Sequence, residues 1–201
     1  MKHLSFLFLA LALSLSTFAQ FGIKAGANAS QFRSGYEPDN KLKTSVVGGL
    51  YAGIPLSNAV ALQIEAIYMC KGSLINRDNA GGRFRMNMNH VHVPVVFRLG
   101  AGQFKIEAGG YASYLAKMNI AKFNYENEIT VYDENDFQRY DFGAVGGIAY
   151  RWDWITFNAR YEHGLKTVGY RNQPLGDYPR NQQKKNQNFV LSMEIPLTRK
   201  R

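Results

Sequence analysis

The chain has a single cysteine, Cys70, among its 201 residues. One cysteine excludes an internal disulfide framework. Its distance from the N-terminus also excludes a lipidated cysteine at the cleavage site of an export signal. The chain shows no linker that would divide it, so its length predicts one domain, held together by packing and backbone hydrogen bonds.

The sequence also lacks an apolar run long enough for a transmembrane helix, which needs about 20 residues. The run from Leu4 to Leu15 is shorter, follows the basic start Met1-Lys2-His3, and precedes the small residues Thr17 and Ala19. This pattern resembles a secretory signal peptide. We therefore predict a signal peptide over residues 1–19, cleaved before Gln20, and an exported barrel domain over residues 20–201.

Helical periodicity is scarce after residue 20, whereas aromatic residues make up 13% of the chain and 19 glycines accompany them. Alternation of apolar and polar residues, typical of strands, recurs in eight segments: 21–31, 44–54, 59–70, 90–100, 103–115, 140–151, 153–164 and 187–197. Long polar connections (32–43, 71–89, 116–139 and 165–186) alternate with short turns (55–58, 101–102 and Trp152). This order predicts an all-β, eight-stranded antiparallel up-and-down barrel with both termini at the short-turn end.

The two faces of these strands differ sharply in charge. The apolar face, which includes Phe21, Ile64, Phe157 and Leu191, carries no Asp, Glu, Lys or Arg. The opposite face carries five cations and five anions, namely Lys24, Arg98, Lys105, Arg151 and Arg160 with Glu65, Glu107, Asp141, Glu162 and Glu194. Alternation alone allows a soluble barrel with the apolar face inside or a membrane barrel with the polar face inside.

Three observations favour the membrane barrel. The polar face is balanced in charge, as expected where charges are enclosed and must pair. It also holds most of the strand glycines, which suit the crowded concave side. Aromatic residues gather near the short turns (Phe97, Phe104, Tyr150, Trp152 and Trp154) and near the long connections (Tyr68, Tyr114, Tyr161 and Phe189). Two aromatic girdles are typical of membrane barrels, in which a charge on the lipid face near the midplane would cost about 2 to 4 kcal/mol. We therefore predict that the ten charged residues form an ion-pair network in the lumen.

The hairpin from Val91 to Leu115 contains a proline, Pro94, within its first strand. Proline cannot donate a hydrogen bond to a neighbouring strand, and every strand of a closed barrel has two neighbours. We therefore expect a bulge or a locally missing bond beside Pro94.

Several of these features together resemble the PorT-type outer membrane protein β-barrel domain family, which is similar in architecture to small OmpA/OmpX-type barrels. They are the leader ending Ala19-Gln20, the opening strand from Phe21 to Asn28, the third strand with Glu65, and the hairpin with Pro94. The resemblance implies the outer membrane of a Gram-negative-type bacterium and, from the founding member, a role as a secretion accessory. The chain departs from many outer-membrane barrels in ending on Thr198-Arg199-Lys200-Arg201 rather than on an aromatic residue.

Two candidate chemical sites are alternatives to simple filling of the lumen by side chains. His90 and His92 share a strand face near Met86 and Met88, but no third metal ligand is identifiable. Lipid A deacylases carry a His-x-Ser pair, which the sequences around the histidines lack, although Ser113 or Ser192 meeting a histidine through folding stays open. We expect no metal, no cofactor and no catalysis.

The long connections are mostly basic, apart from the acidic stretch 116–136. We expect contacts with lipopolysaccharide phosphates or with a partner at Lys166, Arg171, Arg180, Lys184 and Lys185. An exported protein without a recognition motif is not expected to bind nucleic acid.

The leading hypothesis is a monomeric, non-catalytic outer-membrane barrel with a side-chain-filled lumen that acts as a surface or periplasmic interaction scaffold. The alternatives are a secreted soluble barrel that binds a small apolar ligand and a lipid-modifying outer-membrane enzyme.

Overall fold

A computed structural model describes residues 20–33, 40–77, 82–124, 127–130, 138–167 and 185–197. The predicted signal peptide, residues 1–19, lies outside these ranges. No helix in the described part of the chain is long and apolar enough to cross a membrane.

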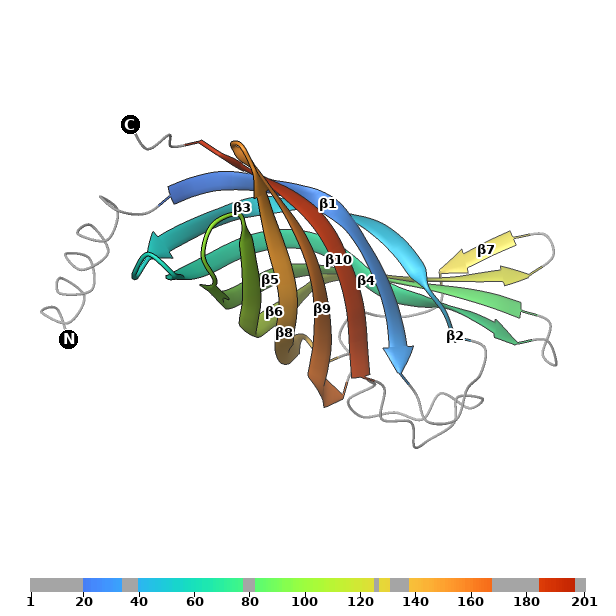
Figure 1. Ribbon diagram of the computed structural model, residues 1–201. Coiled ribbons are helices and arrows are strands. Elements are labelled where there is room, and N and C mark those ends of the chain that lie inside the picture. Colours follow the sequence, from blue (N-terminus) through green and yellow to red (C-terminus); the bar gives the residue numbers. More distant parts are fainter. Residues whose placement is uncertain are drawn as a thin grey trace, which may run out of the picture.

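Eight long strands form a closed antiparallel barrel (Figure 1). They are β1 (Gln20–Arg33), β3 (Lys43–Pro55), β4 (Val60–Arg77), β5 (Gly82–Leu99), β6 (Phe104–Asn124), β8 (Tyr140–Trp152), β9 (Ile155–Thr167) and β10 (Lys185–Pro196). Each pairs with its neighbour along the chain, and pairing of β1 with β10 closes the barrel. Two short strands, β2 (Asn40–Lys41) and β7 (Asn127–Thr130), pair with β4 and β6. The predicted eight-stranded up-and-down barrel is confirmed.

The short turns lie together at one end of the barrel. Gly22 pairs with Pro196, so the start of β1 and the end of β10 lie at this end too (Figure 1). The turn predicted at Trp152 is misplaced: Trp152 still pairs with Ile155, and the reversal occurs at Asp153 and Trp154. Asp153 has a φ of 55°, a left-handed conformation that Asp tolerates better than most residues and that a two-residue turn requires.

The described residues of two predicted long connections, 71–89 and 116–139, are nearly all strand. The β4–β5 ladder continues to the pair Arg77–Gly82, and the β5–β6 ladder to Arg83–Phe123. We call these extensions, together with β2 and β7, the outer-end sheet; in Figure 1 β7 lies at the end of the molecule opposite the start of β1. Beyond the bilayer neither face of a strand has to be apolar. The periodicity that marks strands within lipid therefore stops before the backbone pairing does.

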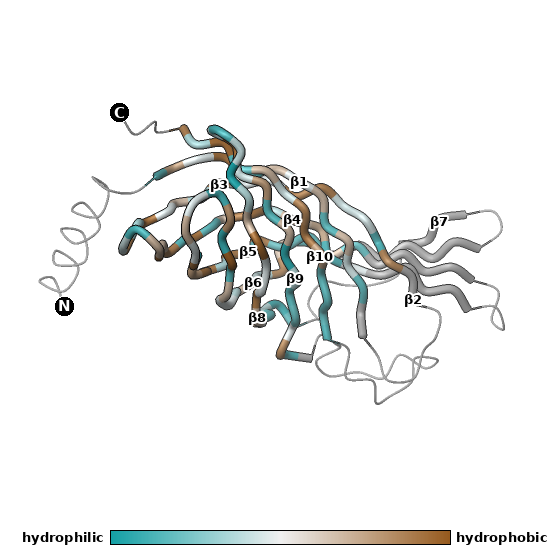
Figure 2. The backbone as a smooth tube through the Cα atoms, viewed as in Figure 1, coloured by the Kyte–Doolittle hydropathy of each residue, from teal (hydrophilic) through white to brown (hydrophobic). Residues whose placement is uncertain are grey.

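Burial alternates along each barrel strand, and hydropathy alternates with it (Figure 2). On β3, where the sequence leaves the parity open, Val46 is 80% exposed and Val47 is 1% exposed. The large apolar residues Val95, Ile148 and Leu191 face outward, and the charged face points into the lumen. This arrangement excludes the soluble barrel with an apolar interior, because its faces would be inverted.

Both predicted aromatic girdles are present on the outer surface. Near the short turns, the ring of Phe104 lies 4.7 Å from that of Tyr150. Near the other end, the ring of Tyr161 lies 5.4 Å from that of Phe189. Such amphipathic belts mark the two membrane interfaces, and the apolar band lies between them.

The ladder beside Pro94 is interrupted as expected. Strands β4 and β5 pair at Ile64–Val95 and again at Ile67–His92 in the same register, but the two intervening pairs are missing. On its other side Pro94 pairs with Tyr111 of β6. The missing amide hydrogen of proline therefore opens a local gap without displacing the strand.

Glycines allow two lumen tyrosines to lie flat against neighbouring strands. Tyr51 covers Gly22, and Tyr111 covers Gly143, so a Cβ atom at either glycine would collide with the tyrosine ring and with a backbone carbonyl of the neighbouring strand. We expect Gly143→Ala to lower the free energy of unfolding by about 1 to 3 kcal/mol, because both the Tyr111 ring and the backbone carbonyl of His163 have to give way. Gly146→Ala is the matched control on the same strand. Nothing lies within 4 Å of its added methyl group, so stability should stay equal or rise by up to about 1 kcal/mol. Urea unfolding of both variants in lipid vesicles measures the difference, and equal effects would show that the close packing at Gly143 does not limit stability.

Candidate functional site: the charged lumen and its mouth

Six charged side chains in the lumen form a closed ring of alternating sign. Lys24 Nζ lies 3.0 Å from Glu65 Oε1 and 3.1 Å from Glu194 Oε1. Arg160 Nη2 lies 2.7 Å from Glu65 Oε1, and its Nε donates to Glu107. Arg98 completes the ring, with Nε 2.7 Å from Glu107 Oε1 and Nη2 2.8 Å from Glu194 Oε1. Six different strands, β1, β4, β5, β6, β9 and β10, therefore meet in one neutral network.

Amide side chains complete the hydrogen bonding of the ring. Gln63 donates to Glu65 and, at 2.8 Å, to Glu194. Asn158 accepts a bond of 2.7 Å from Arg98. All eight residues are buried. Because removing one partner of a buried ion pair leaves an uncompensated charge, the ring strongly couples the strands that carry it.

A second group of charges lies along the lumen towards the outer end. Lys71 Nζ lies 3.3 Å from Asp141 Oδ2, which also accepts bonds from Tyr111 and Asn186. His92 Nε2 lies 3.0 Å from Glu162 Oε1. Asp141 and Glu162 are among the predicted lumen residues, whereas Lys71 is not and lies in the lumen all the same. Counting by twos from Glu65 along β4 reaches Lys71, so the strand parity contained the signal.

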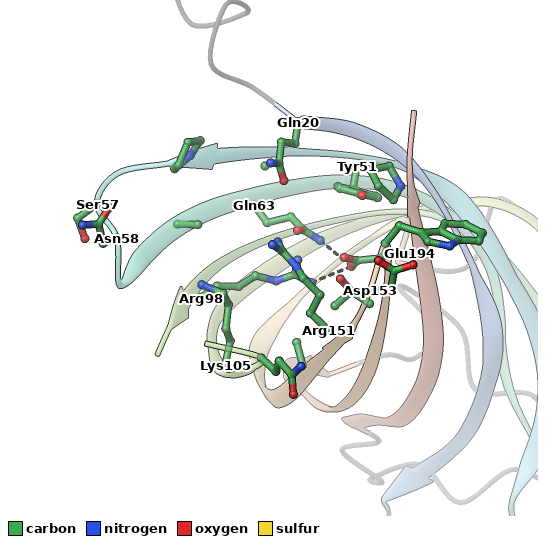
Figure 3. Close-up of a pocket in the computed structure, with 18 residues that line it drawn as sticks. Gln20, Tyr51, Ser57, Asn58, Gln63, Arg98, Lys105, Arg151, Asp153 and Glu194 are labelled. Atoms are coloured by element: carbon green, nitrogen blue, oxygen red, sulfur yellow. Dashed lines mark hydrogen bonds and ion pairs between the residues drawn. The ribbon is translucent and has the colours of Figure 1, made fainter. Parts of the chain in front are cut away.

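Two predicted members of the network, Lys105 and Arg151, lie elsewhere. They line the mouth of the lumen at the short-turn end, where a cavity of about 500 Å³ opens (Figure 3). Neither makes an ion pair with any residue in the described part of the chain. Strand parity shows that a residue faces the lumen, but not how deep it lies, so these two cations could not be separated from the ring by sequence.

His90 and His92 each form a hydrogen bond with a neighbouring group in the lumen. His90 Nδ1 lies 3.0 Å from the carbonyl oxygen of Met88, and His92 bonds Glu162. Among the described residues, no group of three or more His, Cys, Asp or Glu side chains is placed to hold a metal ion.

The lumen brings a serine, a histidine and a glutamate near one another. Ser113 pairs with His92 across β5 and β6, and His92 bonds Glu162. The hydroxyl of Ser113 and Nδ1 of His92 nevertheless have no hydrogen-bond partner, so the two are not bonded to each other. All three residues are buried. A nucleophile needs a hydrogen-bonded base and access to substrate, and this group has neither.

The basic residues expected at the outer end are only partly described. Lys166 Nζ lies 5.7 Å from the centre of the Phe142 ring, and Lys185 begins β10, where it pairs with Thr167. Arg171, Arg180 and Lys184 lie outside the described residues.

Comparisons with known proteins agree with this architecture. The structure of Neisserial surface protein A is similar, with 11% sequence identity and a TM-score of 0.53. The match covers 88% of this chain and 97% of that one. A second similar structure is that of Ail, the attachment invasion locus protein of Yersinia pestis, solved with the heparin analogue sucrose octasulfate. It has 11% sequence identity and a TM-score of 0.50, and the match covers 89% of this chain and 99% of that one. No curated protein sequence matches the chain.

At these identities the two structures show a shared fold, that of small outer-membrane barrels. Residues 14–168 match the family described as "Outer membrane protein beta-barrel domain". With its closed eight-stranded barrel, apolar outer band and charged lumen, the protein is a small barrel of the bacterial outer membrane, and it belongs to the outer membrane protein beta-barrel domain family.

Proposed function

We propose that this protein is a non-catalytic, non-conducting outer-membrane barrel that displays its outer-end sheet as a binding surface for a protein partner. The observation that carries the proposal is the closed ring of six lumen charges, combined with strands that extend past the barrel on one side. The barrel holds the sheet in place, and the sheet provides specificity. A secretion accessory is one form that such a scaffold takes.

The filled lumen supports the non-conducting part of the proposal. An eight-stranded barrel has an interior just wide enough for side chains. Here the ring, Gln63 and Asn158 are all buried and bonded across the interior. Passage of a solute would require several buried ion pairs to break together, which is costly in a low-dielectric interior.

The outer-end sheet supports the binding part. Among the described residues, β7 pairs only with β6 and β2 only with β4, so each leaves one edge unpaired. An unpaired edge offers backbone hydrogen bonds to an added strand. Lys166 and Lys185 lie at the same end and are suited to lipopolysaccharide phosphates, which would orient the sheet on the membrane surface.

The absence of catalysis is part of the same proposal. It is supported by the buried Ser113, which lacks a hydrogen bond to His92. If the protein were instead a lipid-modifying enzyme, lipid A from cells with and without the gene would differ in mass. We expect identical mass spectra.

Planar-bilayer recording and photo-crosslinking together test the scaffold. We expect no large, stable open current from the purified barrel. A photo-crosslinking amino acid at position 76 or 122, in the outer-end sheet, should yield a discrete protein adduct in cells. The same amino acid at Ile148, on the lipid face, is the matched control and should not. A stable open current would contradict the closed lumen, and equal labelling from both places would contradict the binding surface.

A further inference from the structure

The mouth of the lumen at the short-turn end holds two cations, Lys105 and Arg151, that form no ion pair with a carboxylate in the described part of the chain. This end faces the periplasm in outer-membrane barrels. Lys105 pairs across strands with Ala149, so Arg151 is its diagonal neighbour on the same face of β6 and β8. Arg98 lies on the adjacent strand β5, opposite Glu107. Three basic side chains therefore share one face of three neighbouring strands.

The acidic residues near Lys105 and Arg151 either form ion pairs with other cations or lie too far away to pair with these two. Glu107 is bound by Arg98 and Arg160. Glu194 is bound by Lys24, Arg98 and Gln63, two of which appear with it in Figure 3. Asp153 also lines the mouth, but it lies on an exposed turn and forms no ion pair with either free cation. Lys105 and Arg151 are like charges on adjacent strands and repel each other, and an anion bound between them would relieve that repulsion.

The cavity has room for a small anion and offers it a further hydrogen-bond donor. Its volume of about 500 Å³ is in the range of small-molecule sites. The amide oxygen of Gln103 accepts a bond of 3.2 Å from the Tyr150 hydroxyl, which leaves its NH₂ group as a donor at the rim. Arg98, at the inner end of the cavity, is held rigidly by three partners.

We infer that the periplasmic mouth of the barrel binds a small anion through a carboxylate or phosphate group, with Lys105 and Arg151 as its charged contacts. The cavity size favours a small molecule over a folded partner. The site is separate from the outer-end sheet, so it does not depend on the function proposed for that sheet.

Isothermal titration calorimetry of the full-length protein tests the inference. The protein is held in a maltoside detergent, which contains neither phosphate nor carboxylate, and is titrated separately with inorganic phosphate and with succinate. Saturable binding of either anion is expected, and the anion that binds identifies the chemistry. Because hydrogen bonds to charged groups contribute about 1.5 to 3 kcal/mol, Lys105→Gln should weaken binding by at least about tenfold.

The matched control is Lys117→Gln, the same change near the opposite end of β6, where the side chain is exposed. It should bind the anion as the unchanged protein does. The anion should also raise the melting temperature of the unchanged protein, and this rise should be absent in Lys105→Gln/Arg151→Gln. Absence of saturable binding with both anions, or equal weakening by Lys105→Gln and Lys117→Gln, would overturn the inference.

Discussion

Replacing Arg160 with methionine is expected to lower the free energy of unfolding by about 3 to 5 kcal/mol. Arg160 donates to both Glu65 and Glu107, with Nη1 2.9 Å from Glu65 Oε2. Its removal leaves two buried carboxylates with one fewer cation between them. Methionine fills much of the same volume, so the loss reports the missing charge more than a cavity.

Urea titration in lipid vesicles, followed by the fluorescence of Trp152 and Trp154, measures this change. The control is Arg151→Met in a buffer free of phosphate and carboxylates. Arg151 is on the lumen side of the mouth but forms no ion pair with a described residue, so its replacement should change stability by less than about 0.5 kcal/mol.

A second variant covers the case in which Arg160→Met does not fold. Arg160→Met/Glu65→Gln removes one charge of each sign and leaves Lys24 and Arg98 opposite Glu107 and Glu194. This double variant should fold and be more stable than the single variant, because the ring is neutral again. If the single variant were as stable as the unchanged protein, the ring would not be what holds the interior together.

Placing an arginine at Leu191 is expected to lower the free energy of unfolding in a bilayer by about 2 to 4 kcal/mol. Leu191 lies in the middle of β10, is 60% exposed on the outer surface, and pairs with Ala27 and Ala159. At that depth its neighbours on the outside are lipid chains. The charge would therefore have to snorkel or draw water into the bilayer.

The matched control is Phe104→Arg. Phe104 is similarly exposed, at 65%, but begins β6 in the aromatic girdle beside the short turn. An arginine there reaches the interface, and the expected loss falls to about 0 to 1 kcal/mol. Equal, small effects at both positions would mean that the outer face is in water, and the membrane assignment would fail.

The architecture was accessible from sequence because lipid imposes a strict rule on alternate residues. Every second side chain of a spanning strand faces hydrocarbon, so the uncharged set containing Phe21, Ile64 and Leu191 had to point outward. The charged residues on the opposite face then had to point into the lumen, where positive and negative charges must be equal in number to pair. Pro94 was equally informative, since a missing amide hydrogen must interrupt a ladder wherever the strand lies.

The same rule explains what sequence reasoning missed. Outside the bilayer no alternation is required, so the outer-end sheet was predicted as connections although β4, β5 and β6 continue as paired strands. Parity also carries no information on depth along the barrel. Lys105 and Arg151 share a face with the ring residues but lie at its mouth.

The sequence by itself determined the number of barrel strands, the face that most residues of these strands take, with the parity of β3 left open, and the balance of the charges enclosed. Only the tertiary structure decided which charges meet. Lys24 and Glu194 are 170 residues apart in the chain, and they meet because β1 closes on β10. Register and strand tilt set this closure through backbone hydrogen bonds, which every residue other than proline offers alike. The ring of six, and the two mouth cations that have no ion-pair partner in the described part of the chain, therefore follow from how the barrel closes and from no local feature of the chain.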